Sequence, residues 1–141
     1  MENTNEGTNA FKKIFGKDFI RVKLSVLWLF VMLNYIYADI LTLLDPLVAQ
    51  EGGIQITRGM LFFGAILMEI PIAMVVLSLV LKYKINRLAN IVAGTIKTIA
   101  VFGTMFVGTP TLYYLFFAII EMIFTSLIVW IAFRWSVQQK E

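Results

Sequence analysis

The chain has 141 residues, of which 60% are hydrophobic and 15% charged, and its mean hydropathy is +0.83. A soluble domain is roughly 45–50% apolar, so this chain has too little polar surface for water and its outer face must meet lipid. The formal charge of +3 lies in short basic tracts between apolar runs, not on one solvated face, which argues against nucleic-acid binding.

The sequence contains no cysteine and no histidine. This excludes disulfides, thiolate nucleophiles, iron–sulfur ligation and the commonest metal and haem ligand. We therefore expect no cofactor, no metal site and no enzymatic activity. Any chemistry must run on carboxylates, lysine, tyrosine or hydroxyl groups.

Residues 1–23 precede the first long apolar run. Residues 1–10 are polar and are expected to be mobile. Residues 11–22 carry an apolar stripe at helical spacing with lysines largely opposite, which is typical of an amphipathic helix in the headgroup layer. Asp18 falls within that stripe, so a frayed basic lead-in that only orients the chain is an equal alternative.

Four apolar segments follow, and each is about 20 residues long, enough to cross a ~30 Å hydrocarbon core. They are predicted at 24–44, 59–81, 88–107 and 111–133, within a transmembrane domain of residues 24–134 that ends in a cytoplasmic tail, 135–141. The 45–58 connection is either a passive connector or a lid over the outer face. Pro71 interrupts the second segment, where it frees a backbone carbonyl that neighbouring groups must satisfy.

The basic residues predict the orientation. Ten of the twelve lie in the N-terminal lead-in (five), the 82–87 turn (three) and the tail (two). The positive-inside rule then places both termini and the central turn in the cytoplasm, and Trp28 and Trp130 at that interface. The predicted fold is an all-α membrane protein: an antiparallel bundle of four transmembrane helices with cytoplasmic N- and C-termini and a short N-terminal amphipathic segment.

One strongly polar residue of each segment reaches the bilayer midplane, roughly 14–15 Å deep when counted at 1.5 Å per residue. These four residues are Asn34, Glu69, Lys97 and Glu121. A charge that faces lipid at this depth costs about 2.5–3.5 kcal/mol, so Lys97 is expected to face the bundle interior. Asp39 lies about 7–8 Å further out. Polar residues on the same helix faces are predicted to support the layer, namely Tyr35, Asn90 and Thr125.

This charged layer has two interpretations. Three ionised carboxylates against one lysine would leave a net charge of −2 in a low dielectric, so one carboxyl is expected to hold a proton. We expect Glu69 and Glu121 to flank Lys97 and to share that proton. The layer is then either a binding or proton-handling site or a structural cluster that fixes which helix faces meet.

Four stretches of the sequence resemble a functionally uncharacterised family of bacterial four-helix membrane proteins. They are LWLFVMLNYIYADILTLLDP (27–46), LMEIP (67–71), NRLANIVAGTIK (86–97) and VGTPTLYY (107–114). The sequence is also distantly similar to DoxX-like four-helix proteins, which place a glutamate in a comparable second span. These resemblances imply four spans and a bacterial cytoplasmic (inner) membrane, and they assign no catalytic residue.

The leading hypothesis is a small multi-pass membrane protein whose charged layer binds a small polar or cationic ligand or a proton. One alternative is a structural or accessory subunit that packs on a partner membrane protein. Another is a proton-coupled transporter that works as a homodimer, because four helices alone enclose little space for a pathway. The lipid bilayer is a partner in all three.

Overall fold

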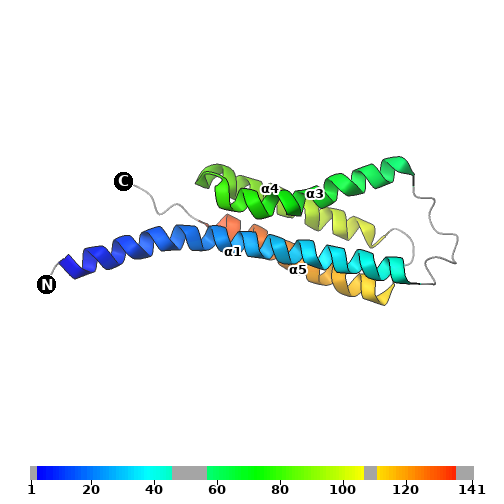
Figure 1. The fold of residues 1–141 in the computed structure, drawn as a ribbon, viewed down its shortest axis with the longest axis horizontal. Helices are drawn as coiled ribbons and strands as arrows, with labels where there is room; N and C mark the ends of the chain where they lie inside the picture. Colours follow the sequence, from blue (N-terminus) through cyan, green and yellow to red (C-terminus); the bar gives the residue numbers. More distant parts are fainter. Residues whose placement is uncertain (1–2, 46–56, 107–110, 136–141) are drawn as a thin grey trace.

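The computed structural model describes residues 3–45, 57–106 and 111–135, with side chains from Phe19 onward except that of Met60. These residues form four helices and no strand: α1 (Asn3–Leu44), α3 (Arg58–Val80), α4 (Tyr83–Thr104) and α5 (Leu112–Arg134). The helices lie side by side in one elongated bundle, and the N-terminal part of α1 extends beyond the others (Figure 1). The prediction of an all-helical fold with four helices is confirmed.

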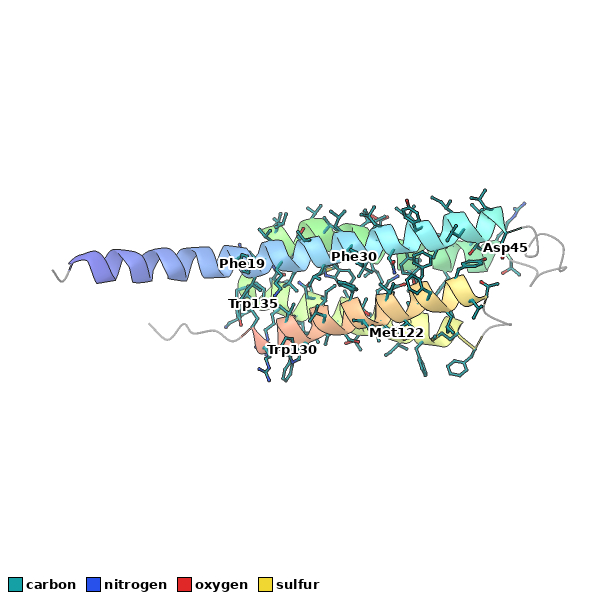
Figure 2. The ribbon with its side chains drawn as sticks, turned by 90° about the horizontal axis from the view of Figure 1, so that it is seen from below. Phe19, Phe30, Asp45, Met122, Trp130 and Trp135 are labelled. Carbon is teal, nitrogen blue, oxygen red and sulfur yellow. The ribbon has the colours of Figure 1, made fainter. Side chains whose placement is uncertain are left out.

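Three of the helices are long and apolar enough to cross a membrane, over residues 19–44, 61–80 and 112–134. Large hydrophobic side chains cover their outer faces, as Figure 2 illustrates. Helix α4 has 22 residues but is less apolar, because it carries three basic residues and two asparagines. The chain therefore has the exterior of a membrane protein, with one helix that is markedly more polar than the rest.

Helix α1 differs from its prediction at the N-terminal end. The sequence predicts a mobile start and a separate lead-in helix, whereas α1 begins at Asn3 and continues without a break to Leu44. Extending an existing helix requires no second nucleation step, so the first membrane segment can carry the lead-in along in helical form. The predicted lid or connector, the turn before α5 and the tail after Trp135 lie outside the described residues.

The connection between α3 and α4 is shorter than predicted. Helix α4 begins at Tyr83 rather than residue 88, so most of the basic turn belongs to its first helical turns. Asn86 explains this, because its side-chain nitrogen donates to the carbonyl oxygens of Ser78 at 2.6 Å and Leu81 at 3.4 Å. The last carbonyls of a helix have no donors within that helix, and the Asn86 side chain supplies donors to these two carbonyls of α3 and its C-terminal end.

The bundle is closed at one end and open at the other. The buried apolar core lies in the half that contains the α3–α4 connection, and its members are Leu24, Trp28, Val31, Met74, Ala93, Ile128 and Trp135. Helix α3 contains Pro71, and its N-terminal half rises away from α4 and α5 (Figure 1). Proline removes one backbone hydrogen bond and bends a helix, which accounts for the change of direction. This divergence leaves space in the open half of the bundle.

Candidate functional site

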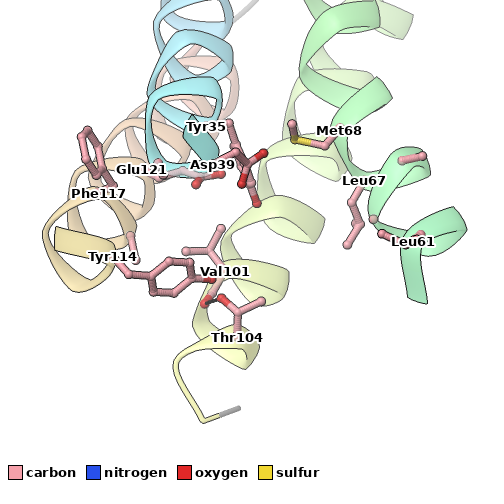
Figure 3. A pocket seen from close by; sticks show the side chains of 14 residues that line it. Tyr35, Asp39, Leu61, Leu67, Met68, Val101, Thr104, Tyr114, Phe117 and Glu121 are labelled. Carbon is pink, nitrogen blue, oxygen red and sulfur yellow. Dashed lines mark hydrogen bonds between the residues drawn. The ribbon is translucent and has the colours of Figure 1, made fainter. Parts of the chain in front are cut away.

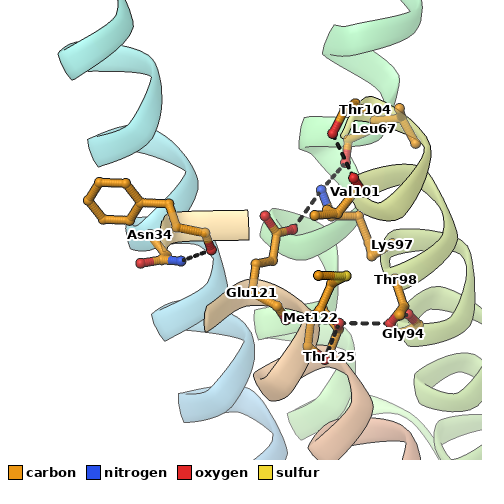
Figure 4. A network of polar contacts seen from close by, with 11 residues as sticks. Asn34, Leu67, Gly94, Lys97, Thr98, Val101, Thr104, Glu121, Met122 and Thr125 are labelled. Atoms are coloured by element: carbon orange, nitrogen blue, oxygen red, sulfur yellow. Dashed lines mark hydrogen bonds and ion pairs between the residues drawn. The ribbon is translucent and has the colours of Figure 1, made fainter. Parts of the chain in front are cut away.

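Lys97 is fully buried at the level where the packed half meets the open half, and groups from the three other helices surround it. Its ammonium nitrogen lies 3.6 Å from Glu121 Oε1 on α5. It donates a hydrogen bond to the Leu67 carbonyl oxygen on α3 at 3.5 Å (Figure 4). The ring of Tyr35 on α1 lies 3.5 Å from the same nitrogen, measured to the ring centroid. The prediction that Lys97 faces the interior is confirmed.

The Leu67 carbonyl is available to Lys97 because of Pro71. In an α-helix the amide of residue 71 would donate to the carbonyl of residue 67, and proline has no amide hydrogen. The sequence predicts that a neighbouring group satisfies this freed carbonyl, and Lys97 does so. The proline and the lysine are therefore coupled, since one creates the acceptor that the other uses.

Tyr35 presents the face of its ring to the ammonium group of Lys97. A cation over an aromatic face is attracted by the ring quadrupole, and the attraction is larger where water is excluded. Glu121 supplies the full negative charge, and its Oε1 is buried with no hydrogen bond beyond the ion pair with Lys97. The lysine thus has a carboxylate, a carbonyl and an aromatic face as its three neighbours.

Glu69 does not lie in the buried layer where the sequence predicts it. The sequence predicts that it flanks Lys97 together with Glu121, but it is exposed on α3, and the salt bridge of Lys97 is with Glu121. The buried face of α3 is set by Pro71, Met74 and Ser78, which are spaced three and four residues apart. Glu69 lies two residues before Pro71, about 200° around the helix, and so points away from the bundle.

Asn34 lies at the expected level but has another partner. Its side-chain nitrogen donates to the Phe117 carbonyl oxygen at 3.2 Å, which joins α1 to α5 one helical turn from Glu121 (Figure 4). Its contact is therefore with the backbone of α5 and not with the lysine. A count of residue depth identifies the level correctly but cannot identify the helix face.

Thr125 lies on the buried face of α5, one turn from Glu121 as predicted. Its hydroxyl oxygen is 2.8 Å from that of Thr98, so one of the two hydroxyls donates to the other and joins α5 to α4. The helices approach closely there because Gly94 has no side chain. A Cβ atom at Gly94 would lie 2.6 Å from Val129 Cγ2 and 3.3 Å from the Thr125 carbonyl oxygen.

Asn90 does not belong to the surroundings of Lys97. It lies two turns away in the packed half, where its Oδ1 accepts from Trp28 Nε1 at 2.7 Å and from Ser78 Oγ at 3.3 Å. Its amide nitrogen donates to Asn86 Oδ1 at 2.7 Å. The sequence predicts Trp28 at the interface, yet it is fully buried. The Asn86–Asn90 spacing of four residues within an apolar helix is the signal that could have revealed this network.

A cavity of about 460 Å³ occupies the open half of the bundle (Figure 3). All four helices line it, and its polar or aromatic lining residues are Tyr35, Asp39, Thr104, Tyr114, Phe117 and Glu121. Asp39 lies at the cavity and has no salt bridge among the described residues, whereas Glu121 is paired with Lys97 behind it. The described residues contain no cluster of acidic side chains suited to a metal ion.

Comparison with known proteins gives one match. The sequence profile of a family of unknown function, DUF6326, matches residues 12–141. Neither the curated proteins nor the solved structures yield a match.

Proposed function

We propose that this chain, which belongs to the DUF6326 family of unknown function, is a membrane protein that binds a small organic cation in the cavity beside Asp39. The observation that carries the proposal is the carboxylate of Asp39, which has no salt bridge among the described residues and lines a largely apolar cavity of about 460 Å³. Ligand sites of small molecules are typically apolar clefts of this size with a few polar groups that fix orientation.

The charge balance of the cavity favours a single positive charge on the ligand. Lys97 pairs with Glu121, so among the described lining residues Asp39 is left as the carboxylate without a salt bridge. In a low dielectric an uncompensated carboxylate is costly, and a bound cation removes that cost. Tyr114 and Phe117 add aromatic surface that suits an organic ammonium group better than a hydrated metal ion.

We place the open end of the cavity on the outer side of a bacterial cytoplasmic membrane. Lys84, Arg87 and Arg134 lie at the other end of the bundle, where Trp130 and Trp135 also lie, while Asp45 and Arg58 lie at the open end (Figure 2). The positive-inside rule then gives four spans with both termini in the cytoplasm. The exposed side chain of Trp130 at the basic end suits that interface.

Binding is favoured over a continuous transport pathway by the packed half of the bundle. Trp28, Asn86 and Asn90 are fully buried there and hydrogen-bonded to one another or to the backbone. A ligand from the cavity would have to break this network to reach the cytoplasm. Transport as a homodimer therefore requires a rearrangement that simple binding does not.

Binding can be tested with benzyltrimethylammonium, a water-soluble organic cation that fits the cavity. We expect saturable binding to the purified protein in lipid nanodiscs, measured by equilibrium dialysis with labelled ligand. Benzenesulfonate, an anion of similar size, should not compete. Asp39→Asn keeps the shape of the side chain and removes its charge, so we expect at least about tenfold weaker binding.

Glu69→Gln is the matched control, because it removes an acid that lies about 7–8 Å nearer the midplane than Asp39, on the exposed face of α3. Its affinity should equal that of the unaltered protein. Equal loss of binding in both variants would point to a diffuse charge effect, and unchanged binding in Asp39→Asn would refute the proposed site. Binding that needs a second membrane protein would instead favour an accessory subunit.

A further inference from the structure

A second cavity, of about 490 Å³, lies between the first turns of α4 and the last turn of α5, at the packed end of the bundle. It is separate from the cation cavity, and no lining residue is common to both. One side is basic and the rest is apolar or aromatic. Its lining residues are Tyr83, Lys84, Arg87, Leu88, Ile91 and Phe133.

Arg87 is held in place by the end of α5. Its Nε donates to the Ala132 carbonyl oxygen at 3.2 Å, and its Nη2 donates to that of Phe133 at 3.1 Å. A guanidinium group has five N–H donors, so three remain for another acceptor. The Tyr83 hydroxyl donates to the Trp135 carbonyl nearby, which fixes the same two helix ends together.

The charge around this cavity is positive. Lys84 is exposed and lies one helical turn from Arg87 on the same helix. Lys82 and Arg134 directly adjoin the lining residues Tyr83 and Phe133 in the sequence. The acidic side chains that the structure describes all belong to the midplane or the open half, namely Asp39, Asp45, Glu69 and Glu121. An anion is therefore attracted here without a competing carboxylate among the described side chains.

We propose that this cavity binds an anionic phospholipid of the cytoplasmic leaflet. Lys84 and the free donors of Arg87 hold the phosphate, and an acyl chain lies along Leu88, Ile91 and Phe133. Basic pockets between transmembrane helices on the cytoplasmic side are known to take such headgroups. The apolar surface next to the basic groups fits a lipid better than a free phosphate ion. The proposal rests on the membrane placement proposed above and is independent of the cation cavity.

Native mass spectrometry of the protein released from nanodiscs with equal amounts of phosphatidylglycerol and phosphatidylcholine tests this site. We expect one phosphatidylglycerol molecule to be retained preferentially. Lys84→Gln should lower that retention by about fivefold, since each basic residue near the surface adds attraction of that order. Lys84 makes no hydrogen bond or salt bridge that the structure records among the described residues, so this variant should fold normally.

Lys82→Gln is the matched control. It removes the same charge two residues from Lys84, and the Lys82 side chain does not line the cavity. It should retain the lipid as the unaltered protein does. Equal loss in both variants would show general attraction to basic residues and overturn the proposal, as would equal retention of the two lipids. Displacement by inorganic phosphate alone would assign the site to the free anion instead. Cation binding should be unaffected in either variant, which separates this result from the test of Asp39.

Discussion

Lys97 and Glu121 form an ion pair that each of them needs. Both are buried, at 0% and 5% exposure, so removal of one leaves an uncompensated charge in a low dielectric. Breaking such a pair is more harmful than replacing both members together. We therefore expect the pair to stabilise the bundle, whereas Asp39, which has no salt bridge among the described residues, is the residue that the proposed cation would contact.

Lys97→Met should lower the free energy of unfolding by about 3–5 kcal/mol, because Glu121 is left buried without its partner. Adding Glu121→Gln should recover a large part of that loss, since the unpaired charge is removed. Unfolding in mixed micelles, followed by circular dichroism, measures both. Ile96→Met, an exposed substitution in the adjacent position, is the control and should have little effect. If the double variant is no more stable than Lys97→Met, the two residues are not coupled.

The sequence is sufficient to predict that Lys97 lies inside the bundle and that Glu121 lies at its level. It is not sufficient for Glu69, because depth in the membrane depends on residue number alone, whereas the inward face depends on helix rotation. The rotation of α3 follows the Pro71–Met74–Ser78 face, which becomes evident only once its neighbours are placed. The aromatic face of Tyr35 above Lys97 likewise depends on how α1 packs.

At the scale of helices, α4 and α5 make the most extensive contact, and α3 packs far more against α1 than against α4. Gly94 allows α4 and α5 to approach closely, and Pro71 bends α3 away from α4. Small residues let membrane helices approach, whereas proline is tolerated where another group takes the freed carbonyl. The open half of the bundle, and with it the cavity, follows from these two residues.

Gly94→Ala should destabilise the bundle by about 1–3 kcal/mol, because the new methyl group would meet Val129 and the Thr125 carbonyl. Gly103→Ala on the same helix is the control, since a methyl group added there would have nothing within 4 Å. That change should be neutral or stabilise by up to about 1 kcal/mol through helix propensity. The two variants are compared by unfolding in mixed micelles. Equal changes in the free energy of unfolding would mean that the close approach of α4 and α5 at Gly94 does not contribute to stability.

At the scale of the whole molecule, the four helices are unequal in their preference for lipid. Three are apolar enough to cross a membrane alone, and α4 is the one whose polar groups are satisfied by the others. Asn86, Asn90 and Lys97 all bond to α3, α5 or α1 or to one another. In the four-span arrangement proposed above, insertion of α4 depends on the neighbours that accept these groups.

This dependence can be measured by inserting a topology reporter after Phe106, just beyond α4, so that α5 is kept. With α1, α3 and α5 all present, the reporter should lie on the outer side of the cytoplasmic membrane. For α4 alone, inserted into a host protein as a test segment, we expect poor insertion, because one central lysine costs about 2.5–3.5 kcal/mol. Lys97→Leu should restore insertion of the isolated segment, since it replaces that cost with a small gain. A cytoplasmic reporter in the longer chain would contradict four spans, while efficient insertion of unaltered α4 alone would show that it needs no help from its neighbours.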